Sequence, residues 1–250
     1  MPRWLKRGRR RLRRRWRRDA SLVMKLAYSH LDLAAIIVFA LCWFGYGWFA
    51  QRHTSGRASL LTVMNPMRER WFEQTLLREN RIVDSSLLAN LMHSATFFSS
   101  TTVLALGGLL ALFGSVEKSA DLFENLPFAQ RSSQQLLEAK VVLLILLFVY
   151  ALIKFTWSVR QFNFVTILIG SLSPKDQVTD DDRRAARGAA GILKLAGENF
   201  GQGMRSYYFA VAVLMWFVQP PFFIAATAIV TLMLYRMEFH SRTIDVLAGK

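Results

Sequence analysis

A small set of polar side chains within apolar sequence is the first place to look for chemistry. Lys154, Ser158 and Gln161 stand at i, i+4 and i+7, so they share one face of a helix. Arg160 and Asn163 accompany them in the same segment. Because a charge at membrane depth is unfavourable, such residues indicate a function by default. These five residues are therefore candidates for a polar path or binding site.

A second polar stripe precedes this one in the chain. His93, Thr96 and Ser100 recur at helical spacing, and two such stripes facing each other could line a water-filled path. The alternative interpretation is structural. In it, Lys154 and Arg160 extend to lipid headgroups while the hydroxyls bond to backbone carbonyls of their own helices. Both interpretations stay open at this stage.

Pro220 and Pro221 interrupt the last apolar run and are candidates for a helix break. Two missing amide hydrogens leave the carbonyls of Trp216 and Phe217 without helical partners. Broken membrane helices use such carbonyls to hold a cation, but a mid-membrane proline more often produces a kink. The length of the run also permits a re-entrant hairpin.

The sequence offers no recognisable catalytic or cofactor motif. Its one cysteine, Cys42, cannot form an intrachain disulfide or a cysteine-based metal site. The four histidines are scattered, and neither a metal-binding HExxH pair nor a phosphate-binding GxxxxGK[ST] loop occurs. We therefore predict no catalytic residue, no metal and no cofactor, and favour a protein that is not an enzyme.

The elements that must position these residues are membrane helices. Three stretches, 33–50, 94–116 and 206–235, contain no Asp, Glu, Lys or Arg. A fourth span is predicted at 141–163, where only Lys154 and Arg160 are charged. About 20 apolar residues suffice to cross a bilayer, so a soluble single-domain enzyme is excluded. Four spans would place both termini on one side of the membrane.

The segments between the spans are also predicted to be helical. A charged helix is expected over 66–93, and no breaker separates it from the next span, so 66–116 could form one rod. Thr179 and the aspartates that follow it predict the start of another helix, which extends to about Glu198. The exposed charges of the first helix are a candidate partner surface: Arg68, Arg78, Glu79, Arg81 and Asp84.

The N-terminal extension, 1–30, is strongly basic. Eleven of its first eighteen residues are Lys or Arg, and the whole chain carries 32 Lys+Arg against 17 Asp+Glu. One interpretation is that this extension is solvated and disordered, or that the true start codon is Met24. Another is that it lies on the membrane surface and binds anionic headgroups. Nucleic acid is the least favoured partner. With this extension included, the basic residues favour placing the two termini on the cytoplasmic side. Without it, they favour placing the two long loops on that side.

Several runs are similar to the DUF599 family of multi-pass membrane proteins. The resemblance covers about 31–247. It rests on Arg68-x-x-Trp71, RENRIVD (78–84), ATFFSST (95–101), Leu126-Pro127-Phe128, KFTWSVRQFN (154–163) and YRMEFHSR (235–242). The family is largely bacterial and of unknown function, so the resemblance implies a bacterial inner-membrane protein and assigns no catalytic residue.

Together these observations predict an all-α, polytopic transmembrane bundle of about four spans with long amphipathic extramembrane helices. The leading hypothesis is a channel or transporter-like protein that passes a small ion or polar solute. The rival hypothesis is a membrane-anchored scaffold that uses the charged helix 66–93. A homo-oligomer is expected under the first hypothesis, because four spans with one polar face enclose little.

Overall fold

The computed structural model describes residues 30–52, 60–115 and 134–247, and no strand occurs among them. The Arg-rich segment 1–29, Met24 and the turn at Leu126–Phe128 lie outside these ranges. The elements are α2 (His30–Arg52), α3 (Leu60–Leu76), α4 (Ile82–Gly114), α6 (Gln134–Gly170), a 3₁₀ turn (Lys175–Gln177), α7 (Asp180–Trp216), α8 (Pro220–Phe239) and α9 (Arg242–Leu247). The predicted all-α class is confirmed.

Four of these helices are long and apolar enough to cross a membrane. The candidate spans are His30–Ala50, Ile82–Gly114, Gln134–Gly170 and Pro220–Ile244. These helices expose many large apolar side chains, for example Leu104 of α4 and Ile167 of α6. The polytopic bundle predicted from composition is therefore present.

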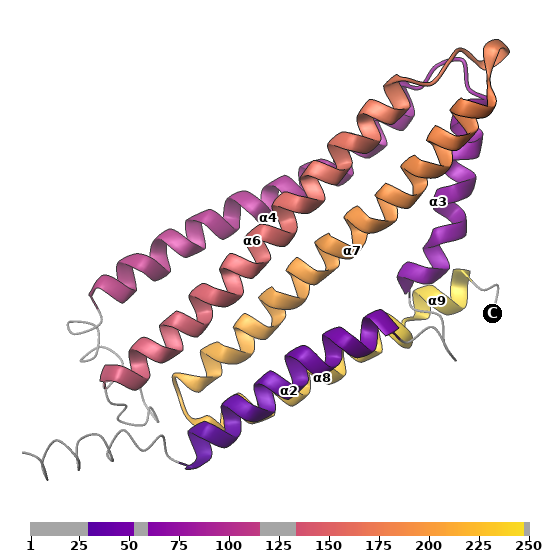
Figure 1. The fold of residues 1–250 in the computed structure, drawn as a ribbon. Helices are drawn as coiled ribbons and strands as arrows, with labels where there is room; N and C mark the ends of the chain where they lie inside the picture. Colours follow the sequence, from indigo (N-terminus) through magenta and orange to yellow (C-terminus); the bar gives the residue numbers. More distant parts are fainter. Residues whose placement is uncertain (1–29, 53–59, 116–133, 248–250) are drawn as a thin grey trace, which may run out of the picture.

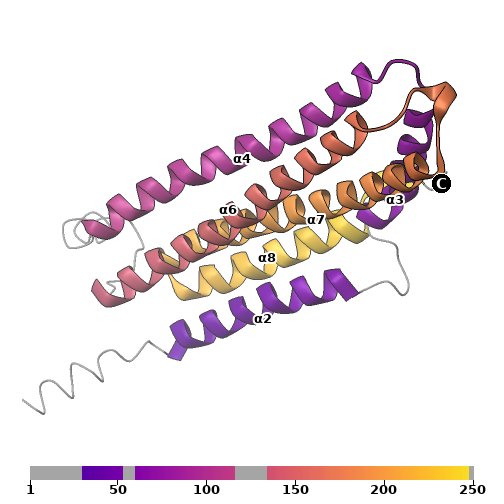
Figure 2. The ribbon, with the colours of Figure 1, turned by 45° about the horizontal axis from the view of Figure 1, so that its top comes forward.

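The apolar run 206–235, predicted as one span, is divided between two helices. Helix α7 ends at Trp216, and α8 begins at Pro220 and runs back beside it (Figures 1 and 2). Pro220 and Pro221 occupy the first turn of α8, where amide hydrogens lack helical acceptors in any case. The prolines thus begin a helix instead of kinking one, and Phe217–Gln219 form the turn.

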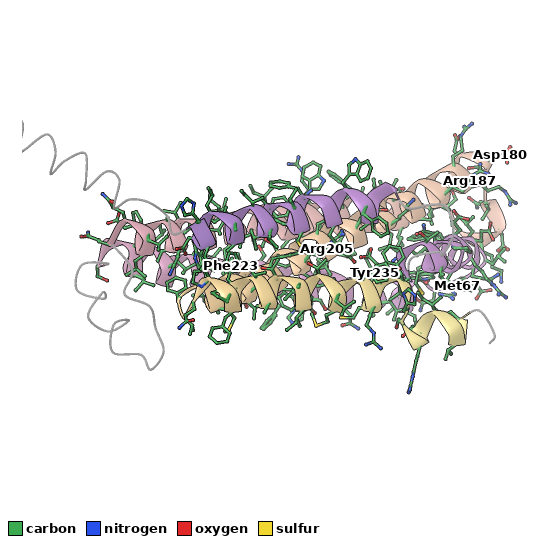
Figure 3. All side chains as sticks on the ribbon, turned by 90° about the horizontal axis from the view of Figure 1, so that it is seen from below. Met67, Asp180, Arg187, Arg205, Phe223 and Tyr235 are labelled. Atoms are coloured by element: carbon green, nitrogen blue, oxygen red, sulfur yellow. The ribbon has the colours of Figure 1, made fainter. Side chains whose placement is uncertain are left out.

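The long helices lie side by side in the order α4, α6, α7, α8, α2, which Figure 2 shows most clearly. Helix α7 therefore adds a further pass through the bundle. At one end, the hairpin end, α7 turns into α8. At the other, the charged end, α3, α9 and the α6–α7 turn gather. Figure 3 marks the two ends by Phe223 and by Asp180 and Arg187.

The extra pass of α7 changes the predicted topology. Helix α2 begins at the hairpin end, whereas the chain ends beyond α9 at the charged end (Figure 1). The expectation that both termini lie on one side was therefore wrong for the described chain. Its cause was the interpretation of 206–235 as a single span.

Two apolar cores follow each other along the bundle. The membrane core, near the hairpin end, contains Phe39, Phe209, Trp216 and Phe223. The outer core, at the charged end, is built by α3, the start of α4, the end of α6 and the first half of α7. Helices α6 and α7 contribute to both cores. Each has 37 residues, so each is about 55 Å long and exceeds the roughly 30 Å hydrocarbon layer.

The predicted helix 66–93 and the longer rod 66–116 are wrong, because the chain turns between Leu77 and Arg81. Within the turn, the side chain of Asn80 accepts a hydrogen bond from the backbone N–H of Ile82 at 2.9 Å, directly before α4. Helix α3 packs instead against α7.

The predicted start of a helix at Thr179 is confirmed, and it closes the α6–α7 turn. Asp182 accepts hydrogen bonds from the Thr179 hydroxyl at 2.6 Å and from the backbone N–H groups of Ser173 and Thr179 at 2.9 and 2.8 Å. These bonds, that of the Thr179 hydroxyl foremost, hold the pKa of Asp182 well below its usual value. The ionised carboxylate therefore stabilises the turn.

Gly203 of α7 allows the Phe155 ring of α6 to approach the backbone of α7 closely. A Cβ atom at this position would lie 2.5 Å from the fully buried ring of Phe155. We expect Gly203→Ala to lower the free energy of unfolding in detergent by about 1–3 kcal/mol, because the ring must move within a packed core. Gly201→Ala is the control, since its Cβ meets nothing within 4 Å. Equal stabilities of the two variants would contradict this packing.

The depressed pKa of Asp182 predicts a pH-dependent stability. The stabilisation is present above the pKa of an unfolded aspartate, about 3.9, and is lost as the pH falls from there towards the folded-state pKa. Asp182→Asn should lower Tm at pH 7, and the difference from the unmodified protein should shrink below about pH 4. Asp181→Asn removes an exposed carboxylate of the same helical turn, which pairs with Arg184, and should change Tm much less.

Candidate functional site

A belt of polar side chains crosses the bundle where the two apolar cores meet. It draws on α2, α6, α7 and α8. We call it the polar belt, and its members are Tyr46, Tyr150, Lys154, Gln161, Asn199, Gln202, Arg205 and Glu238. Along α8, Glu238 lies about 27 Å from Pro220 at 1.5 Å per residue. If Pro220 lies at one face of a hydrocarbon layer about 30 Å thick, the belt lies near the other face.

One half of the polar belt joins α6 to α7. The Lys154 ammonium donates a hydrogen bond to Asn199 Oδ1 at 3.3 Å, and Asn199 Nδ2 donates to Gln161 Oε1 at 2.9 Å. Tyr150 donates to Gln202 Oε1 at 3.5 Å, and its ring lies 5.6 Å from the Lys154 ammonium. The lysine is thus held between an amide oxygen and an aromatic ring.

The other half joins α7 to α8 and α2. Glu238 Oε2 accepts a hydrogen bond of 2.6 Å from the Tyr46 hydroxyl and lies 4.0 Å from Arg205 Nη1. The Arg205 guanidinium stacks over the Tyr46 ring at 5.9 Å and points between α2 and α8 (Figure 3). Among the described residues, Arg205 Nη1 is buried and has no hydrogen-bond acceptor.

The charges of the polar belt are unequal. Lys154 and Arg205 carry two positive charges, within electrostatic range of each other, and Glu238 supplies the one carboxylate. The side chains of Arg205 and Glu238 are only 14% and 17% exposed. A partly buried site with excess positive charge attracts a small anion, and an arginine offers planar paired donors to bind it.

A second charged pair lies towards the hairpin end. Asp32 accepts a 2.7 Å hydrogen bond from Trp216 Nε1, and the Lys140 ammonium lies 5.4 Å from the centre of the same ring. Both charged residues are 3% exposed. Lys140 precedes Lys154 on α6 by about 21 Å. The membrane core, with Phe209 at its centre, separates the two charged groups.

The predicted polar residues of α6 divide into three sets. Lys154 and Gln161 lie in the polar belt and are linked through Asn199. Ser158 is fully buried and donates to the carbonyl of Ala196 at 2.8 Å, so it ties α6 to α7. Arg160 and Asn163 are exposed on the outer face of α6. The Arg160 guanidinium lies 5.6 Å from the Trp157 ring, away from the polar belt.

The polar stripe of α4 does not face the stripe of α6. His93, Thr96 and Ser100 are all exposed, on the helix that forms one edge of the bundle. The Thr96 hydroxyl bonds to the carbonyl of Met92 in its own helix, as a solitary membrane hydroxyl does. Two facing stripes are thus not formed within one chain.

The predicted partner surface is largely turned inward. Fully buried Asp84 accepts a 2.7 Å hydrogen bond from Trp71 Nε1 and pairs with Arg78. Arg81 donates to the carbonyls of Leu172 and Ser173 in the α6–α7 turn at 2.7 and 2.6 Å, and to that of Thr75 near the end of α3 at 3.2 Å.

The remaining two residues of that surface differ from these. Glu79 is exposed and pairs with Lys175. Arg68 is half-buried and lines an apolar cleft.

Sequence reasoning missed Arg205, Asn199, Gln202 and Glu238. A signal existed in α7, because Asn199, Gln202 and Arg205 recur every three residues just before the apolar run. Glu238 had no such pattern; it joins the polar belt only because α8 folds back beside α7. No group of three His, Cys, Asp or Glu side chains placed to hold a metal occurs within 30–52, 60–115 and 134–247.

The inward contacts of Arg81 predict the outcome of substitution there. Arg81→Gln removes a charged donor from three carbonyls and should lower the free energy of unfolding by about 1.5–3 kcal/mol. Glu79→Gln, which breaks an exposed ion pair, should change it by less than about 1 kcal/mol. Chemical unfolding in detergent measures both. An equal effect of the two variants would argue against a structural role for Arg81.

Comparison with known proteins agrees with the architecture. A family model described as "Protein of unknown function, DUF599" matches residues 34–243, from the first span to the end of α8 and the start of α9. A search of curated proteins and of solved structures finds no match. The matched region contains the polar belt and both apolar cores. The chain therefore belongs to the DUF599 family of proteins of unknown function.

Proposed function

We propose that this protein is a transporter-like membrane protein that passes a small anion, which binds at the polar belt. The observation that carries the proposal is the state of Arg205. Its guanidinium is 14% exposed, is 4.0 Å from the nearest carboxylate, and has a buried Nη1 without an acceptor among the described residues. A buried donor left unsatisfied is unfavourable by about 1–3 kcal/mol, and an anion or water removes that penalty.

The surroundings of Arg205 support an anion more than a cation. Lys154 adds a second positive charge, and Gln202, whose Oε1 accepts from Tyr150, adds an amide group that can donate to an anion. Pores that pass anions or phosphate carry Arg and Lys for the same reason. A purely structural charge pair would be expected to have closer contact than the 4.0 Å between Arg205 and Glu238.

Passage would require an opening between α6, α7 and α8. The apolar membrane core separates the polar belt from the Asp32–Lys140 pair, and apolar constrictions act as gates. Two hydroxyls line this interval. Ser206 donates to the carbonyl of Leu147 at 2.8 Å, and Thr227 Oγ1 is buried without a partner among the described residues. A small separation of α6 from α7 would free Ser206 to meet an anion.

Anion flux into proteoliposomes tests the proposal. The purified protein is reconstituted, and uptake of chloride and of nitrate is followed with an entrapped anion-sensitive dye under a valinomycin-clamped potential. We expect flux above that of empty vesicles, and a loss of at least about tenfold in Arg205→Gln and in Lys154→Met, because each removes a charge from the site.

The matched control is Arg160→Gln, which removes an equal charge from the exposed face of α6 and should leave the flux unchanged. Circular dichroism and gel filtration of each variant establish that it is folded. Flux of both anions no faster than through empty vesicles would refute the proposal. So would folded Arg205→Gln and Lys154→Met proteins as active as the control.

A further inference from the structure

A cleft of about 600 Å³ opens at the charged end, between α3, α4, α6 and α7. Pockets that hold small ligands span roughly 300–1,000 Å³, so its size is sufficient. Its walls include Met67 and Trp71 of α3, Phe98 of α4, Phe162 of α6, and Leu193 and Phe200 of α7. The cleft is separate from the polar belt and has no part in the function proposed above.

The cleft has an apolar floor and a charged wall. Phe162 and Leu193 at its base are 4% and 3% exposed, whereas Met67 at its edge is 46% exposed. Within 30–52, 60–115 and 134–247, Arg68 is the one charged residue of its lining, and its Nη1 donates to Asn65 Oδ1 at 2.8 Å. Burial lowers the pKa of the Arg68 guanidinium from its usual value, while Glu198 acts in the opposite direction. A nearby anion would offset this desolvation.

The level of the cleft matches a membrane surface. Ser94 lines it from α4 and begins the stretch 94–115 that has no charged residue. Helix α3, which carries Arg68, is not among the candidate spans and contributes to the outer core. The α4 wall of the cleft thus lies at the edge of the apolar stretch 94–115, and the α3 wall, with Arg68, lies beyond that edge. Lipid phosphates occupy this level of a bilayer.

We infer that the cleft binds an anionic phospholipid of the surrounding membrane, with one acyl chain between Trp71 and Phe162 and the phosphate at Arg68. The apolar lining fits a hydrocarbon chain, and a planar guanidinium binds phosphate through two parallel hydrogen bonds. Because Arg68 is the one cation among the described residues that line the cleft, selection between lipids rests on it. An anionic headgroup is therefore preferred over a zwitterionic one.

Native mass spectrometry of the full chain in mild detergent tests this inference. Phosphatidylglycerol and phosphatidylcholine with identical acyl chains serve as probes. We expect the unmodified protein to retain the phosphatidylglycerol at least about tenfold more tightly, and Arg68→Gln to lose this preference. Arg70→Gln removes the same charge from an exposed position of the same helix and should keep it. Ser94→Trp fills the cleft with a side chain and should weaken binding of both lipids.

Each other outcome overturns the inference in a defined way. Equal retention of the two lipids by the unmodified protein, or equal losses in Arg68→Gln and Arg70→Gln, would show a diffuse surface attraction. Unchanged binding in Ser94→Trp would show that no acyl chain enters the cleft. Displacement of the phosphatidylglycerol by millimolar inorganic phosphate would assign the site to a free anion. A dimer that Ser94→Trp abolishes would assign the cleft to a second copy of the chain. Arg68→Lys, which keeps the charge, distinguishes lost binding from misfolding, since it should retain part of the lipid preference.

Discussion

The close approach of α6 and α7 at Gly203 and Phe155 is the contact on which the rest of the structure depends. The absence of a side chain at Gly203 allows the fully buried Phe155 ring to lie against the backbone of α7. Lys154 precedes this ring, and Asn199 lies one helical turn before the glycine. The apolar packing at Phe155 therefore fixes the register of the hydrogen bond between Lys154 and Asn199. This packing is stronger and less dependent on water than the hydrogen bond.

Helices α6 and α7 also connect the membrane core to the outer core. Because α6 and α7 are longer than a bilayer is thick, their outer halves need a second core, and α3 and the start of α4 complete it. The Asp182 cap at one end and the Pro220 turn at the other fix where α7 begins and ends. The polar belt lies between the two cores.

Composition sufficed to predict the membrane helices, because a helix in hydrocarbon must carry an apolar exterior. Composition did not predict that α7 passes through the bundle, because the first half of this helix is rich in charged residues. It also failed for the segment between Leu77 and Arg81. A continuous helix was expected there, but Arg81 donates to the carbonyls of Leu172 and Ser173, and Asp84 accepts a hydrogen bond from Trp71. Tertiary partners, which no local pattern specifies, decided the turn.

Two residues of the polar belt, Lys154 and Gln161, could be predicted from the sequence. Lys154 and Gln161 share a helix, so their spacing places them on one face without knowledge of the fold. Tyr46, Arg205 and Glu238 come from three helices, and only the reversal of the chain at Pro220 brings Glu238 beside Arg205.

On α7 the polar belt and the apolar cleft remain distinct surfaces. At about 100° per residue, Asn199 and Gln202 face α6, while Leu193 and Phe200 face the cleft, so one helix supports two sites of opposite polarity.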